Sequence, residues 1–210
     1  DLEGTDITIV LTADDWREFI EPRILRRGGP YMGGHLNYPA PSLKMNGVIV
    51  ATSLTFGGPV PRTTLMVENG KVAQVQGGGK FGDRLRDSFE RYAKLTCTQF
   101  SKLGPGVNWV TTIGMGTHPK AFRSPYFESL AGSARVYAWS FGHRRSGVIH
   151  TSIGEGLVSP TYRVIRHVDT YFNTIITDKG TVVENGHLTT LEDPRVRQVA
   201  AKYGDPDELL

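Results

Sequence analysis

Val67-Glu-Asn-Gly-Lys-Val72 is the stretch that decides the fold class of this chain. Asparagine and glycine tolerate the left-handed backbone of a type I′ turn, and residues of apolar strands stand on both sides of the pair. The sequence therefore predicts a tight hairpin between two antiparallel strands. Val183-Glu-Asn-Gly-His-Leu188 has the same pattern near the other end of the chain, and we expect a second hairpin there.

Short runs rich in β-branched residues alternate with glycine-rich turns along the rest of the chain, which is typical of antiparallel sheets. The expected strands are residues 7–11, 47–51, 64–67, 71–75, 107–111, 135–140, 148–152, 167–172 and 181–183. We therefore predict a fold of the α+β class, with predominantly antiparallel strands and two or three helices.

A helical pattern follows each hairpin, at residues 83–95 and at residues 193–203. In the second helix, Asp193 is the expected cap and Pro194 occupies the first turn. Its predicted apolar face consists of Val196, Val199, Ala200 and Tyr203. We expect the tail, residues 205–210, to be frayed or packed on a partner.

The composition is that of an ordinary globular protein. Of the 210 residues, 39% are apolar and 21% are charged, which is enough for one sizeable core or two small ones. No low-complexity linker divides the sequence, so residues 1–210 are expected to form a single domain. Because the chain begins without an initiator methionine, we expect it to be a portion of a longer polypeptide.

Charge and cysteine content argue against several classes of protein. The net charge is +3. Basic residues form short clusters such as His143-Arg144-Arg145, whereas a nucleic-acid binder has a continuous basic stripe. No run approaches the roughly 18 apolar residues of a membrane span. The single cysteine, Cys97, excludes an internal disulfide and a thiolate metal cluster. We therefore expect a cytoplasmic protein without nucleic-acid or membrane partners.

The pair His167-Val-Asp169 carries the most informative chemistry in the sequence. Residues two apart in a strand point to the same face, so the imidazole and the carboxylate converge. Both belong to the set of two histidines and one carboxylate that holds non-haem Fe(II) with coordination positions left open. His118 and His150 are the candidates for the third ligand. A hydrogen-bonded pair without a metal is the alternative interpretation.

Other polar residues are candidates for catalysis. His150 and Ser152 share one face of an expected strand, where they could exchange protons with a substrate or bind its oxygen atoms. His35 lies in a glycine- and proline-rich stretch, residues 33–39, which is expected to be a loop that lines a pocket.

The remaining histidines differ in their surroundings. Gly114 and Gly116 precede His118 and predict a sharp turn that would hold this histidine beside a ligand. His143 and His187 are expected to be surface residues.

Six segments, in this order, resemble the carboxy-terminal part of the thermophilic aminopeptidase T-like metallopeptidase family. Within that family, the chain is most similar to the branch of 2,5-dihydroxypyridine 5,6-dioxygenases. The segments are Leu2-Glu-Gly-Thr-Asp6, Asn46-Gly-Val-Ile-Val50, Val67-Glu-Asn-Gly-Lys-Val72, Gly114-Met-Gly-Thr-His-Pro-Lys120, His150-Thr-Ser-Ile-Gly154 and His167-Val-Asp169.

The glutamates that complete the two-metal site of the peptidases have no counterpart here. Tyr38-Pro-Ala-Pro41 replaces a Gly-Glu-Val pattern, and Thr112 and Arg145 stand where the peptidases have glutamates. Two adjacent divalent ions need that negative charge. His118 stands where the peptidases commonly have asparagine. The resemblance therefore implies a site for one metal ion with two histidines and one aspartate.

The resemblance implies an Fe(II)-dependent ring-cleaving dioxygenase that acts with O2 on 2,5-dihydroxypyridine or a similar aromatic, as in nicotinate degradation. Its implied metal ligands are His118, His167 and Asp169, and its implied catalytic residues are His150, Ser152 and His35. No site for an organic cofactor is implied. The alternatives are a metal-dependent aminopeptidase that uses Zn, Co or Mn, and a non-catalytic metal-binding fragment.

The candidate ligands place the expected metal site at strand ends. The resemblance implies that residues 1–210 are a single metal-binding catalytic domain, the carboxy-terminal portion of a longer two-domain polypeptide. By analogy with the family, we also expect a homo-oligomer.

Overall fold

The computed structural model of the chain describes residues 1–15, 17, 34–39, 44–55, 58–95, 103–121, 142–154, 157–159, 162–163 and 166–210. The expected strand at residues 135–140 lies outside these ranges. Within the described ranges, the main sheet consists of eight strands: β1 (Asp6–Val10), β2 (His35–Pro39), β3 (Lys44–Leu54), β4 (Gly58–Glu68), β5 (Lys71–Gly77), β6 (Val110–Gly116), β7 (Ile149–Ile153) and β10 (Arg166–Thr170).

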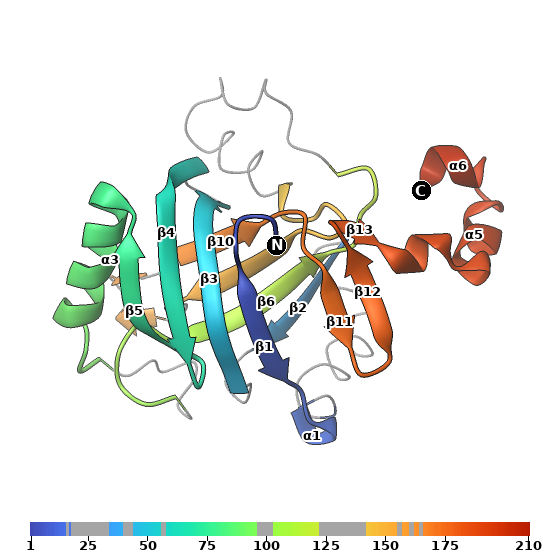
Figure 1. Ribbon diagram of the computed structural model, residues 1–210. Coiled ribbons are helices and arrows are strands. Elements are labelled where there is room, and N and C mark those ends of the chain that lie inside the picture. Colours follow the sequence, from blue (N-terminus) through green and yellow to red (C-terminus); the bar gives the residue numbers. More distant parts are fainter. Residues whose placement is uncertain are drawn as a thin grey trace.

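All pairs in the main sheet are antiparallel, and the strand order is β2-β6-β7-β10-β3-β4-β5, with β1 also paired to β3 (Figure 1). The 11-residue strand β3 is long enough to pair with β1 at its start and with β10 at its end. This pairing places β10, which carries His167 and Asp169, inside the sheet. The predicted fold class is confirmed.

Smaller strands form two further sheets, one of three strands and one of two. They are β11 (Ile175–Thr177), β12 (Gly180–Glu184) and β13 (His187–Leu188) in the first, and β8 (Leu157–Ser159) and β9 (Tyr162–Arg163) in the second.

Both asparagine-glycine hairpins are confirmed. Asn69 and Gly70, between β4 and β5, have φ angles of 49° and 77°. Asn185 and Gly186, between β12 and β13, have φ angles of 48° and 83°. Positive φ at both central residues is the signature of the type I′ turn, whose twist matches that of the strands it joins.

Two segments that were expected to be turns or loops are strands. The strand expected at residues 107–111 is β6, which begins at Val110. It continues through Gly114 and Gly116, where a sharp turn was expected. His35 lies in β2, paired with β6, and not in a loop. The glycines of β6 serve close packing, because a Cβ at either one would lie 2.0–2.1 Å from a neighbouring atom.

The main hydrophobic core lies against the sheet and includes Leu65, Ile153 and Val168, each 0% exposed. The helix α3 (Gly79–Arg91) packs on β4 and β5 and contributes Phe81 and Leu85 to this core (Figure 1). It begins four residues before the predicted start, because consecutive glycines with positive φ turn the chain directly after β5.

The chain ends in the 3-10 helix η3 (Thr189–Glu192) and the helices α5 (Pro194–Ala200) and α6 (Pro206–Leu209). Asp193 caps α5 as predicted, because its side chain accepts a hydrogen bond from the backbone N–H of Arg195. Within the described ranges, every helix falls short of the length and apolar character that a membrane crossing requires.

The prediction that the second helix packs through an apolar face is wrong. No residue of α5 is buried, and Val199 and Tyr203 are 53% and 82% exposed. The second hydrophobic cluster is instead built from Val183, Leu188 and Leu191, and Leu210 packs against it. The tail therefore folds as α6 and packs on its own chain.

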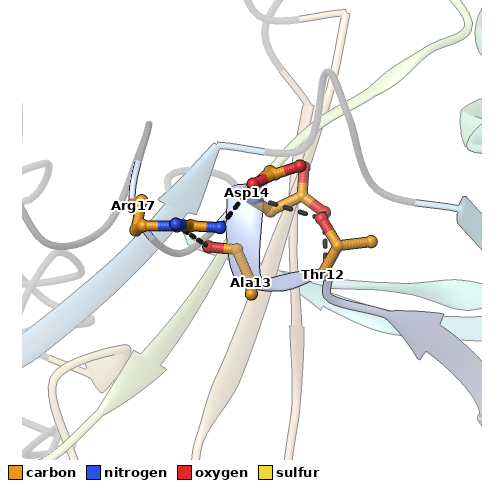
Figure 2. A network of polar contacts seen from close by, with 5 residues as sticks. Thr12, Ala13, Asp14 and Arg17 are labelled. Carbon is orange, nitrogen blue, oxygen red and sulfur yellow. Dashed lines mark hydrogen bonds and ion pairs between the residues drawn. The ribbon is translucent and has the colours of Figure 1, made fainter.

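The short helix α1 (Ala13–Asp15) begins with reciprocal hydrogen bonds (Figure 2). The backbone N–H of Thr12 donates to Asp15 Oδ2 at 2.8 Å, and the N–H of Asp15 donates to Thr12 Oγ1 at 3.1 Å. Arg17 pairs with Asp14 on the exposed side. This arrangement is a capping box with aspartate in place of glutamate.

Thr12→Ala is expected to lower the free energy of unfolding by about 1 kcal/mol, because the capping hydroxyl is lost. Arg17→Ala is the matched control and should change stability by less than about 0.5 kcal/mol, since it removes an exposed ion pair with Asp14 and an exposed hydrogen bond to the carbonyl of Ala13. Urea unfolding monitored by circular dichroism measures both values. Equal losses in the two variants would contradict the capping assignment.

Candidate metal centre

Two neighbouring strands bring four of the predicted site residues to one face of the main sheet. Between β10 and β7, Asp169 pairs with His150 and His167 pairs with Ser152. Partners in an antiparallel pair share a face, as do residues two apart in one strand. The four side chains therefore lie on the same face, and Val168, which points the other way, is in the hydrophobic core.

The strands β6 and β2 extend this polar face. His150 pairs with Gly114 of β6, and His35 of β2 pairs with Gly116. We call the resulting set the histidine face; it consists of His35, His150, Ser152, His167 and Asp169.

Three imidazoles are in direct contact at one part of this face. His35 and His150 meet His143, which lies in the turn before β7, and potential ligand nitrogens of the three all lie within 4.8 Å of one another. The exposed fractions are 1%, 4% and 4% in the order His35, His143, His150. His35 Nε2 and His150 Nδ1 are 2.7 Å apart and share a hydrogen bond. We call these three residues the histidine cluster.

Gly114 makes the contact between His35 and His150 possible. A Cβ at this position would lie 2.1 Å from His150 Cε1 and 2.3 Å from His35 Nε2. Such distances are far below van der Waals contact, so any side chain here would push the two imidazoles apart. The absence of a side chain at Gly114 is therefore part of the geometry of the cluster.

The prediction that His143 is a surface residue is wrong. The turn that carries it is fixed against the chain beyond β6, where the N–H of His118 donates to the carbonyl of Arg144 and the N–H of Ser146 donates to the carbonyl of His118. A Cβ at Gly116 would lie 2.0 Å from the carbonyl oxygen of Arg145, so this glycine lets the turn pack onto β6.

Sequence reasoning missed His143 because the residue begins a basic cluster, and basic clusters are usually solvated. The signal that was available is the pair of glycines in β6, which leaves room for a neighbouring segment to approach. The prediction for His187 is confirmed: this side chain is exposed and lies 3.2 Å from Glu192.

Burial keeps the imidazoles of the cluster neutral. It lowers the pKa of His35 to about 3, and the positive charges of His143, Arg144 and His167 add to the effect. The pKa of His143 falls to about 4, through burial and then through Arg144 and His167. The pKa of His150 is also well below its ordinary value, mainly through burial. Neutral imidazole is the form that binds a metal ion.

The other part of the histidine face is held by hydroxyl groups. Ser152 Oγ lies 3.2 Å from His167 Nδ1, and the hydroxyl of Thr55 donates to Asp169 Oδ1 at 2.6 Å. The ring of His167 also stacks on that of His150, with centroids 5.5 Å apart. Asp169 is 1% exposed, whereas His167 is half-buried. These contacts fix the orientation of both potential ligands.

His118 lies outside the histidine cluster. Its side chain is exposed, and its Nδ1 accepts a hydrogen bond from the N–H of Lys120, so a metal ion would bind through Nε2. In the part of the chain that the structure describes, the group of three potential ligands whose atoms lie within 4.8 Å of one another is the cluster, not the predicted set. Metal binding by His118, His167 and Asp169 stays a prediction.

Comparisons with known proteins identify the fold. No family model and no curated protein matches the chain. The solved structure of the 2,5-dihydroxypyridine dioxygenase from Pseudomonas putida KT2440 is similar, with a TM-score of 0.50 and 18% identity over 69% of this chain. The chain spans 40% of the length of that protein. At this level of identity, the likeness shows a shared fold.

The neutral cluster predicts how the stability of the metal-free protein depends on pH. Unfolded histidines take up protons below their ordinary pKa of 6.5, whereas His35 and His143 stay neutral in the folded state to about 3 and about 4. Stability is therefore fully present above pH 6.5 and is lost as the pH falls. Each histidine contributes a slope of up to about 1.4 kcal/mol per pH unit.

Urea unfolding of chelator-treated protein between about pH 4 and pH 7 measures this slope. His143→Gln should make the slope shallower by the share of one histidine. An unfolding midpoint that is constant over this range in the wild-type protein would mean that the imidazoles titrate in the folded state as they do in the unfolded chain.

Proposed function

We propose that the chain is an Fe(II)-dependent ring-cleaving dioxygenase that acts on a dihydroxylated pyridine or a similar aromatic compound. The observation that carries the proposal is the histidine face, where four adjacent strands gather imidazoles and a carboxylate. The sequence resemblance to 2,5-dihydroxypyridine dioxygenases and the shared fold support the same function.

The chemistry of the donor set fits a transition metal. Imidazole nitrogens and one carboxylate suit Fe(II) and other divalent transition-metal ions, whereas Mg²⁺ and Ca²⁺ prefer oxygen ligands. Asp169 is the carboxylate of the histidine face, and Thr112 stands where the metallopeptidases have a glutamate. The charge for a second adjacent ion is thus absent from these positions, which favours the dioxygenase over an aminopeptidase.

Under this proposal, His167 and Asp169 hold the ion together with His118, the third ligand that the sequence predicts. Ser152 orients the ring of His167, and Thr55 fixes one oxygen of Asp169. When bound, Fe(II) supplies the route by which electrons pass from the ring to O2. Both oxygen atoms end in the ring-opened product.

The neutral imidazoles of His35 and His150 are suited to bind the hydroxyl groups of the substrate. Each has one nitrogen that can accept a proton and one that can donate, and the 2.7 Å contact between them links the two rings. The contact uses one nitrogen of each ring, so one of the two remaining nitrogens can accept a hydrogen bond from a substrate hydroxyl and the other can donate one. Ser152 is the third candidate for contact with the substrate.

Oxygen uptake by anaerobically reconstituted protein tests the function. Purified chain is loaded with Fe(II), desalted, and mixed with 2,5-dihydroxypyridine in an oxygen-electrode cell, while a zinc-loaded sample is assayed for peptide hydrolysis. We expect iron-dependent consumption of one O2 per ring opened. Iron-loaded protein that consumes no oxygen, or zinc-loaded protein that hydrolyses peptides with two ions bound, would contradict the proposal.

A further inference from the structure

We propose that the histidine cluster, His35, His143 and His150, is itself a binding site for a divalent transition-metal ion. Its ligands differ from the set His118, His167 and Asp169 that the sequence predicts. Metal binding by the cluster does not depend on the oxygenase activity, so it can be tested separately.

The spacing of the three imidazoles is close to that of a metal site. Metal–nitrogen bonds of about 2.1 Å place neighbouring ligand nitrogens about 3.0–3.4 Å apart. One ring nitrogen from each histidine of the cluster lies within 4.8 Å of those of the other two. Shifts of an ångström or so in imidazole tips would therefore create the coordination geometry without any movement of the strands.

Unsatisfied nitrogen atoms are the second observation that points to a ligand. Within the described residues, His35 Nδ1 and His143 Nδ1 are buried and have no hydrogen-bond partner. Burial of a polar atom without a partner costs free energy. Leucine or phenylalanine side chains would fill the same space without this cost. A metal ion bound at Nδ1 of His35 or of His143 would give that atom the partner it lacks.

The chemistry of the cluster limits which ions it would hold. Three neutral nitrogen donors without a carboxylate suit Zn²⁺, Fe²⁺, Co²⁺ or Ni²⁺ and disfavour Mg²⁺ and Ca²⁺. Three protein ligands are also one fewer than a closed structural zinc site contains, so the fourth position would be open to water or to a substrate atom. The cluster therefore has the number of protein ligands that a catalytic metal site has, not that of a closed structural site.

Metal titration of two matched histidine variants tests the inference. The chelator-treated chain of 210 residues is titrated with Zn²⁺ alone and with Co²⁺ alone, and bound metal is measured by calorimetry and by elemental analysis. His143→Gln keeps a polar side chain of similar size and should weaken metal binding by at least about 100-fold. His187→Gln removes an exposed histidine and should bind like the wild-type chain.

Two further measurements identify the metal ligands and show whether the variant is folded. X-ray absorption of the zinc-loaded wild-type chain should show scattering from three imidazoles, and circular dichroism verifies that the His143→Gln chain is folded. A folded His143→Gln protein that binds Zn²⁺ and Co²⁺ as tightly as the wild type would overturn the inference.

The variant Asp169→Ala separates this inference from the proposed function. If it loses Fe(II) and oxygen uptake but keeps the Zn²⁺ that His143→Gln loses, the cluster and the predicted ligand set are two sites. If it keeps Fe(II) while His143→Gln loses both iron and oxygen uptake, the cluster is the iron site and the predicted ligand set is wrong. Either result upholds metal binding by the cluster.

Discussion

Gly114→Ala is expected to weaken metal binding by the histidine cluster by at least about 100-fold while the chain still folds. The new Cβ would lie 2.1 Å from His150 Cε1 and 2.3 Å from His35 Nε2, so both rings must turn away. Because the atoms in conflict are the tips of side chains, not the backbone, the cost to the free energy of unfolding should be only about 1–3 kcal/mol.

The control for this prediction is Gly104→Ala. A Cβ at Gly104 would meet the ring of Trp109 at 3.5 Å, which is ordinary van der Waals contact. Calorimetric titration with Zn²⁺ and urea unfolding should therefore give wild-type values for this variant. If Gly114→Ala retained wild-type metal affinity, the cluster would not be the metal site, because its two rings cannot keep their positions beside a methyl group.

Asp169→Ala is expected to abolish iron retention and to reduce oxygen uptake with 2,5-dihydroxypyridine by at least about 100-fold. The reason is that this buried carboxylate carries the negative charge of the histidine face. Inductively coupled plasma analysis of iron and an oxygen electrode measure the two effects on the same reconstituted sample.

Thr55→Val tests the hydrogen bond that orients the Asp169 carboxylate. It removes the hydroxyl that donates to Asp169 Oδ1 but keeps the carboxylate, so a smaller loss of about 10–100-fold is expected. Asp178→Ala removes an exposed carboxylate elsewhere and should have no effect. Full iron content in folded Asp169→Ala protein would exclude this aspartate as a ligand.

The local part of the structure could be predicted from the sequence. The hairpins at Asn69 and Asn185 depend on two residues each, and the cap at Asp193 depends on its neighbours in the chain. The shared face of His167 and Asp169 likewise needs only the alternation of a strand. Such features are decided by residues a few positions apart, so they are visible in the sequence.

The assembly of the centre depends on which strands are neighbours, and this is not a local property. The pairing of β7 with β10 sets Asp169 opposite His150, and the pairing of β2 with β6 brings in His35 from a stretch that resembles a loop. His143 was assigned to the surface because its own neighbours are charged. It is buried because Gly116 admits the turn onto β6.

Metal content after anaerobic reconstitution tests most directly whether the histidine face is a metal centre. Wild-type chain is loaded with Fe(II), desalted and analysed for bound iron beside the double variant His150→Ala/Asp169→Ala, which removes one residue from each candidate ligand set. We predict at least one iron per wild-type chain and none in the double variant. A wild-type chain that retains no iron, or a double variant that retains as much as the wild type, would contradict the account.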